Sequence, residues 1–351
     1  MSGESTYAAA GVDIQAGERA VELMRKWVDA ARRPEVMGGI GGFAGLFDAS
    51  ALKGFDHPLL ATSADGVGTK VALASAMDRY TTVGHDLVGM LVDDLVVCGA
   101  EPLFVTDYIA CGRVVPSRIA AIVQGVAEAC VLAGCALLGG ETAEHPGLLG
   151  PDDFDLAGAT TGVVEAAALL GPDRVRAGDA VVAMGSSGLH SNGYSLVRHV
   201  LLDRAGWALD RHVDEFGRSL GDELLEPTRI YAQDCLALAA AVDVHAMSHV
   251  TGGGLAANLG RVLPAGTGAD IDRHTWSPAP VFEVVRAVGD IAREEMERTL
   301  NMGVGMVAVV AAEAADAAVT LLRDRGVPAW RCGAVVAGKS SVRLLGEHRR
   351  A

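Results

Sequence analysis

The chain has 351 residues; half of them are hydrophobic and 21% are charged, and 29 Lys and Arg against 44 Asp and Glu give a formal net charge of −15. This composition predicts a soluble globular protein with one large domain or two smaller ones. A net-negative chain without a cluster of basic residues is a poor ligand for nucleic acid or an anionic membrane, so we expect neither partner.

Targeting and redox signals also favour a cytoplasmic protein. The first 17 residues lack the apolar core of a signal peptide, and no apolar run approaches the ~18 residues of a membrane span. No two cysteines form a C-x-x-C pair, and most lie in apolar runs, which predicts buried reduced thiols rather than disulfides or a zinc site. The six are Cys98, Cys111, Cys130, Cys135, Cys235 and Cys332.

A glycine-rich segment follows the first predicted helix, residues 18–33, which Pro34 ends. Five of the eight residues from Gly38 to Gly45 are glycine, too many for a stable helix or strand. The segment is either a linker or a mobile flap whose amides wrap an anion. Ile40 and Phe43 favour the flap, since linkers are usually polar.

The next segment, Ser63 to Lys70, joins a predicted buried strand (58–62) to a predicted helix (71–77). It brings a carboxylate, two glycines, a hydroxyl and an ammonium to one strand-to-helix turn. A helix N-terminus favours an anion, Asp65 is a candidate metal ligand, and Lys70 can neutralise phosphate. The glycine spacing is not that of a P-loop, and a tight turn with a solvated lysine is the alternative.

Further acids follow in the same half of the chain. Asp93 and Asp94 lie beside the apolar stripe of a predicted helix, residues 83–99, where a metal ion would offset the cost of burying a carboxylate. The alternative is that both acids face solvent. After a strand (102–110), a helix (115–134) and another strand (135–138), the run Gly139 to Glu144 again joins glycines to an acid and a hydroxyl.

The second half begins near Gly171 and Pro172, where we place the domain boundary. A strand (180–184) leads into the glycine turn 185–193, and a strand (244–247) leads into the turn 248–254 before a further helix. These turns carry His190 and His249, which could move protons near neutral pH. A helix starting after His190 would lower the pKa of its ring and keep it neutral.

Strands and helices mix in both halves without strict alternation. We therefore predict an α+β protein of two domains, residues 1–170 and 171–351, each a mixed sheet flanked by helices. The glycine turns with Asp65, Asp93, Asp94 and Glu141 indicate a polyphosphate nucleotide held through metal ions. Hydrolase and protein-kinase signatures are absent from the sequence.

Long stretches of this sequence resemble the phosphoribosylformylglycinamidine cyclo-ligases, also called aminoimidazole ribonucleotide synthetases, of an ATP-binding superfamily. The resemblance covers both domains, in residues 7–17, 33–43, 65–70, 94–104, 139–146, 185–198, 225–231, 249–254 and 301–306. Two positions depart from the family pattern: Asp93 replaces the usual Asn, which leaves its role open, and Met302 replaces the usual Cys.

The resemblance implies ATP- and Mg²⁺-dependent closure of the imidazole ring of formylglycinamidine ribonucleotide in de novo purine biosynthesis, with release of ADP and phosphate. K⁺ is a further candidate ion. It also implies a cytoplasmic homodimer formed through the sheets of the first domain, which binds ATP and metal, while the second domain completes the cleft. The alternatives are another ATP-dependent phosphoryl-activating enzyme of the superfamily and a non-catalytic nucleotide-binding scaffold.

The resemblance also assigns candidate roles to residues. The metal ligands are Asp65, Asp94 and Glu141, and the catalytic residues are Lys70, His190 and His249. The substrate phosphate would bind at Thr251, Gly252, Gly253 and Gly254. The residues assigned to ATP are Gly38, Gly39, Gly41, Gly42, Asp65, Gly68, Thr69, Lys70 and Thr142.

Overall fold

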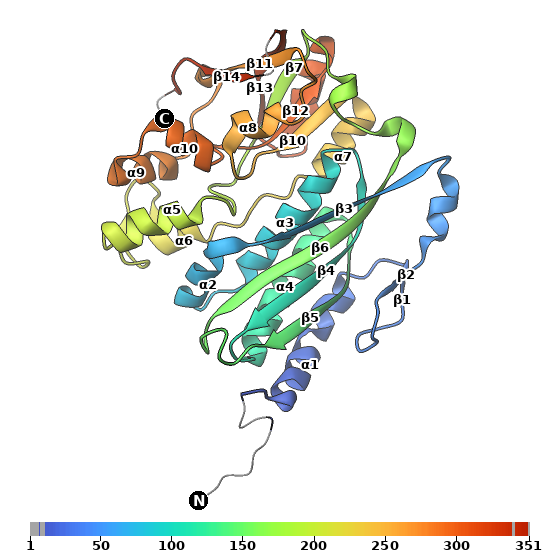
Figure 1. Cartoon of the computed structure of the whole chain (residues 1–351), viewed down its shortest axis with the longest axis vertical. Helices are drawn as coiled ribbons and strands as arrows, with labels where there is room; N and C mark the ends of the chain where they lie inside the picture. The colour runs from blue at the N-terminus through green and yellow to red at the C-terminus, as the bar shows by residue number, and fades with distance from the viewer. Residues whose placement is uncertain (1–6, 8–10, 339–340, 350–351) are drawn as a thin grey trace, which may run out of the picture.

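The structure is a computed structural model that describes residue 7, residues 11–338 and residues 341–349. Two mixed sheets flanked by helices form the molecule (Figure 1), so the predicted α+β fold class is confirmed. The first sheet uses residues up to Glu165 and the second uses residues from Ala180 onward.

The first sheet has the strand order β3 (Pro58–Gly66), β6 (Phe154–Glu165), β4 (Glu101–Cys111) and β5 (Ala136–Glu144). Only β4 and β5 run parallel, and α4 (Pro116–Ala133) connects them. Helices α1 (Ile14–Ala30), α3 (Thr81–Val96) and α4 lie on one side of this sheet, behind the strands in Figure 1. The short hairpin of β1 (Val36–Met37) and β2 (Leu46–Phe47) follows α1 and encloses the glycine-rich segment.

The second sheet has six strands in the order β10-β12-β7-β13-β11-β14. All its neighbours are antiparallel except β11 and β14. The strands are β7 (Ala180–Gly185), β10 (Val244–His249), β11 (Thr267–Asp272), β12 (Val304–Val310), β13 (Ala329–Ala337) and β14 (Val342–Leu345). Its helices are α5 (Tyr194–Arg198), α6 (Leu220–Leu224), α7 (Ala232–Ala241), α8 (Gly254–Gly260), α9 (Pro280–Gly289), α10 (Arg293–Thr299) and α11 (Ala315–Asp324). Two shorter strands, β8 (His212–Val213) and β9 (Arg218–Ser219), form a separate hairpin.

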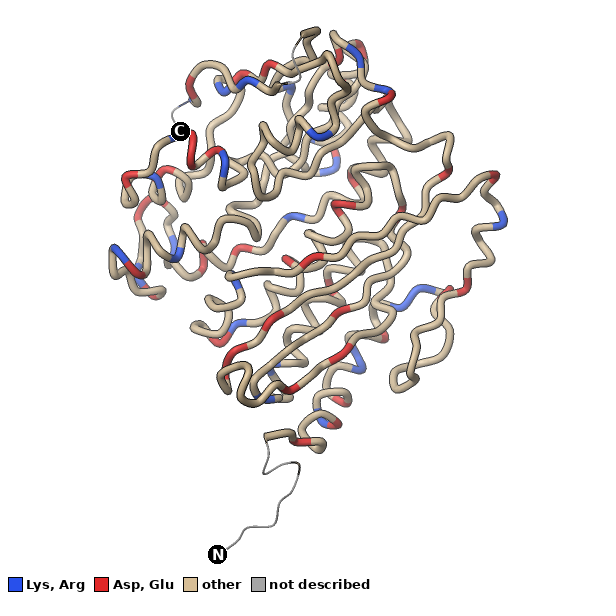
Figure 2. Tube along the Cα trace, in the orientation of Figure 1, with Lys and Arg blue, Asp and Glu red and all other residues tan. Residues whose placement is uncertain are grey.

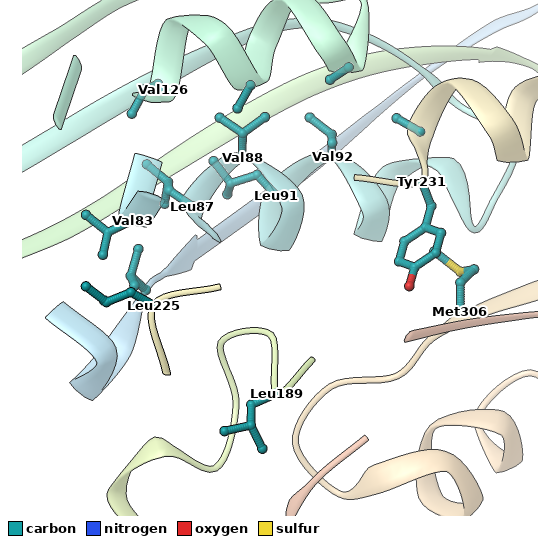
Figure 3. Close-up of a cluster of buried hydrophobic side chains, with 14 of the residues drawn as sticks. Val83, Leu87, Val88, Leu91, Val92, Val126, Leu189, Leu225, Tyr231 and Met306 are labelled. Carbon is teal, nitrogen blue, oxygen red and sulfur yellow. The ribbon is translucent and has the colours of Figure 1, made fainter. Parts of the chain in front are cut away.

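Helix α3 lies at the centre of the molecule. It is apolar around most of its circumference, as a helix buried on several sides must be. Val83, Leu87 and Leu91 are fully buried, and one hydrophobic cluster runs from α3 and α4 to the second domain. Figure 3 shows these side chains between Val126 of α4 and Tyr231 of the second domain. Burial of this surface therefore stabilises the contact between the domains as well as each domain.

Helix α4 corrects the expectation that no apolar run approaches the length of a membrane span. Its 18 residues have a mean hydropathy of 1.3, which is long and apolar enough to cross a membrane by those two criteria alone. It packs against α1, α3, β4 and β5, and residues such as Ile119, Ile122 and Val126 are fully buried. A buried core helix can satisfy the same two criteria, so the length and hydropathy of α4 are weak evidence for a membrane span.

Candidate active site

The junction between the two domains brings together acids and a histidine from three elements. Asp65 lies near the end of β3, and one of its carboxylate oxygens accepts a hydrogen bond from the Gly66 amide at 2.7 Å. Asp94 lies near the end of α3, and His249 ends β10 of the second sheet. His249 Nδ1 lies 2.9 Å from an Asp94 carboxylate oxygen, so these two residues join the domains directly.

The charges at this junction influence one another. Partial burial, followed by the nearby charge of Asp94, raises the pKa of Asp65. Burial acts to lower the pKa of His249, but the hydrogen bond that it donates to Asp94 and the charges of Asp93, Asp94 and Asp65 outweigh it, so the pKa rises. Such a group of carboxylates attracts a cation, as the raised pKa of His249 reflects.

Asp93 and Asp94 have different surroundings although they are adjacent. The Asp94 side chain is 44% exposed, whereas Asp93 is fully buried. Asp93 accepts a hydrogen bond from the Tyr231 amide at 2.9 Å, and burial raises its pKa to about 7. Of the two alternatives left open for this pair, solvent exposure applies to Asp94 only, and Asp93 connects α3 to the second domain.

Lys70 does not point toward a phosphate site. Its side chain is fully buried, and Nζ donates to Asp86 Oδ1 at 2.8 Å and to the carbonyls of His190 and Glu226 at 2.9 and 2.7 Å. An ammonium has three N–H donors, so these contacts use all of them. Burial lowers the pKa of Lys70, against the opposing effect of Asp86. The predicted contact with ATP is therefore wrong for this conformation, and Lys70 holds the domains together.

His190 is also buried, with only 2% of its surface exposed. Its Nε2 accepts a hydrogen bond from the Ser187 amide at 3.2 Å, and its ring packs on Tyr231. The pKa lies well below its usual value, as predicted, but the main cause is burial, followed by the charges of His249, Lys70 and Arg229. A ring enclosed in this way is poorly placed to exchange protons with a substrate, so the geometry favours a structural role.

The glycine-rich segment borders a cavity of about 440 Å³ at the β5 edge of the first sheet. Gly39, Gly41 and Gly42 line it together with Thr142 of β5, which was also predicted to bind ATP, and Glu141 of β5, which was predicted to bind metal. Gly38 is adjacent, and its carbonyl accepts a hydrogen bond from Arg32. Phe43 is fully exposed, which leaves this apolar side chain free to close onto a ligand.

The predicted metal ligands are only partly brought together. Among the described residues, no group of three or more His, Cys, Asp or Glu side chains is placed to hold a metal ion. Asp65 and Asp94 are close to each other, whereas Glu141 lies at the far edge of the sheet, on β5. Mg²⁺ often binds through one or two carboxylates plus substrate phosphates, so Asp65 and Asp94 fit a metal that arrives with a nucleotide.

The turn from Thr251 to Gly254 follows β10 directly and leads into α8. Asn258 Nδ2 donates to the carbonyls of Thr251, Gly252 and Gly254 at 3.3, 3.2 and 2.9 Å. A Cβ at Gly254 would lie 1.7 Å from a backbone oxygen, so only glycine fits there. The turn is therefore a fixed structure beside His249. Gly68 and Thr69 lie in the turn after β3, where the Thr69 hydroxyl contacts the Ser195 hydroxyl across the domains at 3.1 Å.

The sequence analysis missed two buried acids. Asp86 accepts hydrogen bonds from Lys70 and from both the amide and the hydroxyl of Thr228. Asp107, in the middle of β4, lies on the wall of the cavity and is 9% exposed. A signal for each existed, since both are single acids at inward positions of apolar elements, where an unpaired charge is costly.

The sequence was compared with family models and the fold with solved structures, and the sequence resembles the AIR synthase related proteins. Two family models match, the AIR synthase related protein N-terminal domain over residues 48–164 and the corresponding C-terminal domain over residues 176–345. Solved structures share the fold at low sequence identity. A thiamine-monophosphate kinase from Stenotrophomonas maltophilia aligns with a TM-score of 0.70 and 22% identity, covering 94% of this chain and 97% of that one. A hydrogenase maturation protein HypE in complex with ATP aligns with a TM-score of 0.62 and 21% identity, covering 97% and 95%.

Curated relatives narrow the class. The chain is 51% identical over 332 residues to the phosphoribosylformylglycinamidine cyclo-ligase of Geobacillus kaustophilus, covering 95% of this chain and 96% of the relative. It is 50% identical over 335 residues to the cyclo-ligase of Myxococcus xanthus, covering 95% and 97%. The chain belongs to the phosphoribosylformylglycinamidine cyclo-ligase family, whose members are carbon–nitrogen ligases, as its sequence motifs indicated.

Proposed function

We propose that this protein uses ATP to close the imidazole ring of formylglycinamidine ribonucleotide, giving 5-aminoimidazole ribonucleotide, ADP and phosphate in de novo purine biosynthesis. The formyl amide oxygen receives the γ-phosphoryl group, the amidine-side nitrogen attacks the activated carbon, and the carbon–oxygen bond to phosphate breaks. The attacking nitrogen loses its proton. Phosphorylation is needed because an amide oxygen is a poor leaving group and phosphate is a good one.

The observation that carries this proposal is the contact of Asp94 with His249, beside Asp65, where the domains meet. Asp65 and Asp94 would hold Mg²⁺, which would neutralise charge on the phosphoryl group when bound. Glu141 lies three strands from Asp65, so it would contact the nucleotide or its metal ion from the cavity side. His249 orients the Asp94 carboxylate through its Nδ1 contact, so we regard it as a positioning residue.

The remaining residues would bind the substrates. The glycine segment Gly38–Gly42 would close over ATP, with Thr142 as a polar contact from the cavity wall, and would exclude water. The turn Thr251–Gly254 would hold the ribose phosphate of the substrate, because it is held by Asn258 and begins two residues after His249. Gly68 and Thr69 would contact ATP from the turn that follows Asp65.

We also propose that the protein is a cytoplasmic homodimer joined through the first sheet. The side of this sheet opposite the helices carries uncharged residues such as Leu60, Tyr108 and Ala159, and Leu60 is 66% exposed. The four strands contain no Lys or Arg, and Figure 2 shows basic residues scattered elsewhere. The same face carries the acids Glu141 and Asp155, and its exposed apolar residues, such as Leu60 and Tyr108, are typical of a subunit interface.

Formylglycinamidine ribonucleotide-dependent release of ADP tests the proposed function directly. We expect one ADP and one aminoimidazole ribonucleotide per turnover with Mg²⁺, and parallel assays with Na⁺ and K⁺ salts would define any monovalent-ion requirement. ADP release with thiamine monophosphate instead would indicate another enzyme of the superfamily. ATP binding without turnover on either substrate would indicate a scaffold.

A further inference from the structure

A buried carboxyl group without a partner lies in the cavity beneath the glycine segment. Asp107 Oδ2 has no hydrogen-bond partner among the described residues, and the residue is 9% exposed. Burial raises its pKa to about 7, and no cation contributes to this shift. An unsatisfied buried polar atom is costly, so a group retained there is expected to bind something that completes the site.

The neighbouring strand leaves space for this carboxyl group. Asp107 lies opposite Gly140 of β5, and a Cβ at Gly140 would lie 1.6 Å from Asp107 Oδ1. Any other residue at position 140 would displace the carboxyl group from its position on the cavity wall. The orientation of Asp107 therefore depends on the absence of a side chain at Gly140.

The walls around Asp107 suit a flat apolar ligand. Met24 and Val28 of α1 line one side of the cavity, and Val123 and Leu137 line another. With a volume of about 440 Å³, the cavity falls within the usual range of small-molecule sites. A phosphate would be repelled by the carboxyl group, and the nearby Arg32 guanidinium donates to the carbonyls of Val36 and Gly38 instead. A neutral ligand with an N–H donor matches this environment best.

Asp107 lines the same cavity as the glycine segment and Thr142. Asp65, Gly158 and Asp107 lie in one row across β3, β6 and β4. Two strand spacings separate the acids by roughly 10 Å. Leu87 and Leu91 of α3 pack over Gly158 in this row, so a triphosphate would leave the cavity past Glu141 and Thr142, under the glycine segment.

We propose that Asp107 recognises the adenine base of ATP by accepting a hydrogen bond from its exocyclic amino group, and so determines the nucleotide specificity of the enzyme. This inference rests on the proposed function only in requiring that the cavity binds ATP. Above the pKa of Asp107 the carboxylate can only accept, so a 6-oxo purine places an acceptor where adenine has a donor, and the site then loses its hydrogen bond. Sites that pair a buried polar group with a ligand N–H reject analogues that lack it.

Isothermal titration calorimetry with ATP and inosine triphosphate tests this role without using turnover. We expect the wild-type protein to bind ATP at least about tenfold more tightly than inosine triphosphate. Asp107→Asn should reduce that preference to within about threefold, because an amide can donate to the 6-oxo group. Asp155→Asn, an exposed acid on the same sheet that does not line the cavity, should keep the full preference.

A second measurement needs no variant. N6,N6-dimethyl-ATP lacks the amino hydrogens, and the wild-type protein should bind it about tenfold more weakly than ATP. Equal wild-type affinities for all three nucleotides would overturn the inference, as would an unchanged preference in a folded Asp107→Asn protein. If the wild-type protein prefers ATP as expected but does not close the ring, the proposed reaction is contradicted and the role of Asp107 in nucleotide recognition still holds.

Discussion

Lys70 has the charge to bind a phosphate, but its three donors are used by Asp86 and by two carbonyls of the second domain. Lys70→Met would leave Asp86 as a buried charge without its cation, although Thr228 would still donate to it. We expect the free energy of unfolding to fall by about 3–5 kcal/mol. ATP affinity of the folded variant should stay within about threefold of wild type, because Nζ has no free donor for a phosphate.

Urea denaturation and nucleotide titration of the same variant would check both parts. Lys53→Met, at an exposed lysine, is the matched control and should change neither quantity. A stable Lys70→Met protein that binds ATP a hundredfold more weakly would restore the phosphate role.

Asp107 should make stability depend on pH. Its folded pKa of about 7 exceeds the unfolded value of about 3.9, so the folded state binds the proton more tightly and loses stability as pH rises between those values. Asp107→Asn removes that loss. The gain in unfolding free energy over wild type should be about 2–3 kcal/mol larger at pH 8 than at pH 5. Urea melts at the two pH values measure it, and an equal difference at both would contradict the raised pKa.

His249 connects two elements, because it lies at the end of β10 and contacts Asp94 of α3. His249→Ala leaves Asp94 without its Nδ1 partner, so the carboxylate is less well oriented for a metal. We expect the Mg²⁺ concentration for half-maximal turnover to rise about tenfold or more. His245→Ala, at a buried histidine paired with Asp179 outside this junction, is the control and should leave the Mg²⁺ requirement unchanged. A fall in turnover at saturating Mg²⁺ with no change in that requirement would argue against the positioning role.

The glycine segment is the element we expect to move. Gly38 to Gly45 has few side chains to pack, and Phe43 is fully exposed. Hydrogen exchange of residues 37–45 should slow on addition of ATP and Mg²⁺, while the exposed turn 214–217 in the second domain should not change. Equal exchange of residues 37–45 with and without nucleotide would rule out a closing flap.

Local sequence signals predicted the elements around the site well. Apolar runs followed by glycines identified the turns after β3, β7 and β10, because a strand that must reverse into a helix needs such residues. The predicted end of the strand at residue 138 was wrong: β5 continues through Gly140 to Glu144, because β4 pairs with it as far as Glu144. Helix α7 begins at Ala232, after a segment in which the amides of Thr228 and Tyr231 donate to Asp86 and Asp93.

At the scale of the whole molecule, the sequence could not show which side chains meet across the domains. The contact of His249 with Asp94 spans 155 positions, and that of Lys70 with the Glu226 carbonyl spans 156. No local pattern encodes such pairs, and they depend on the docking of α3 against both sheets. The sequence therefore marked Asp94, His249, Lys70 and His190 as candidates, but it could not show that Lys70 and His190 are buried in contacts between the domains.

The central claim is that the Asp65, Asp94 and His249 junction is where ATP activates the substrate. The most direct test is the rate of aminoimidazole ribonucleotide formation by Asp94→Asn at saturating Mg²⁺, ATP and formylglycinamidine ribonucleotide, with wild type and Asp155→Asn measured alongside. We expect Asp94→Asn to keep its fold and lose at least about a hundredfold in turnover, with Asp155→Asn near wild type. A well-folded Asp94→Asn enzyme with turnover close to wild type would contradict this assignment.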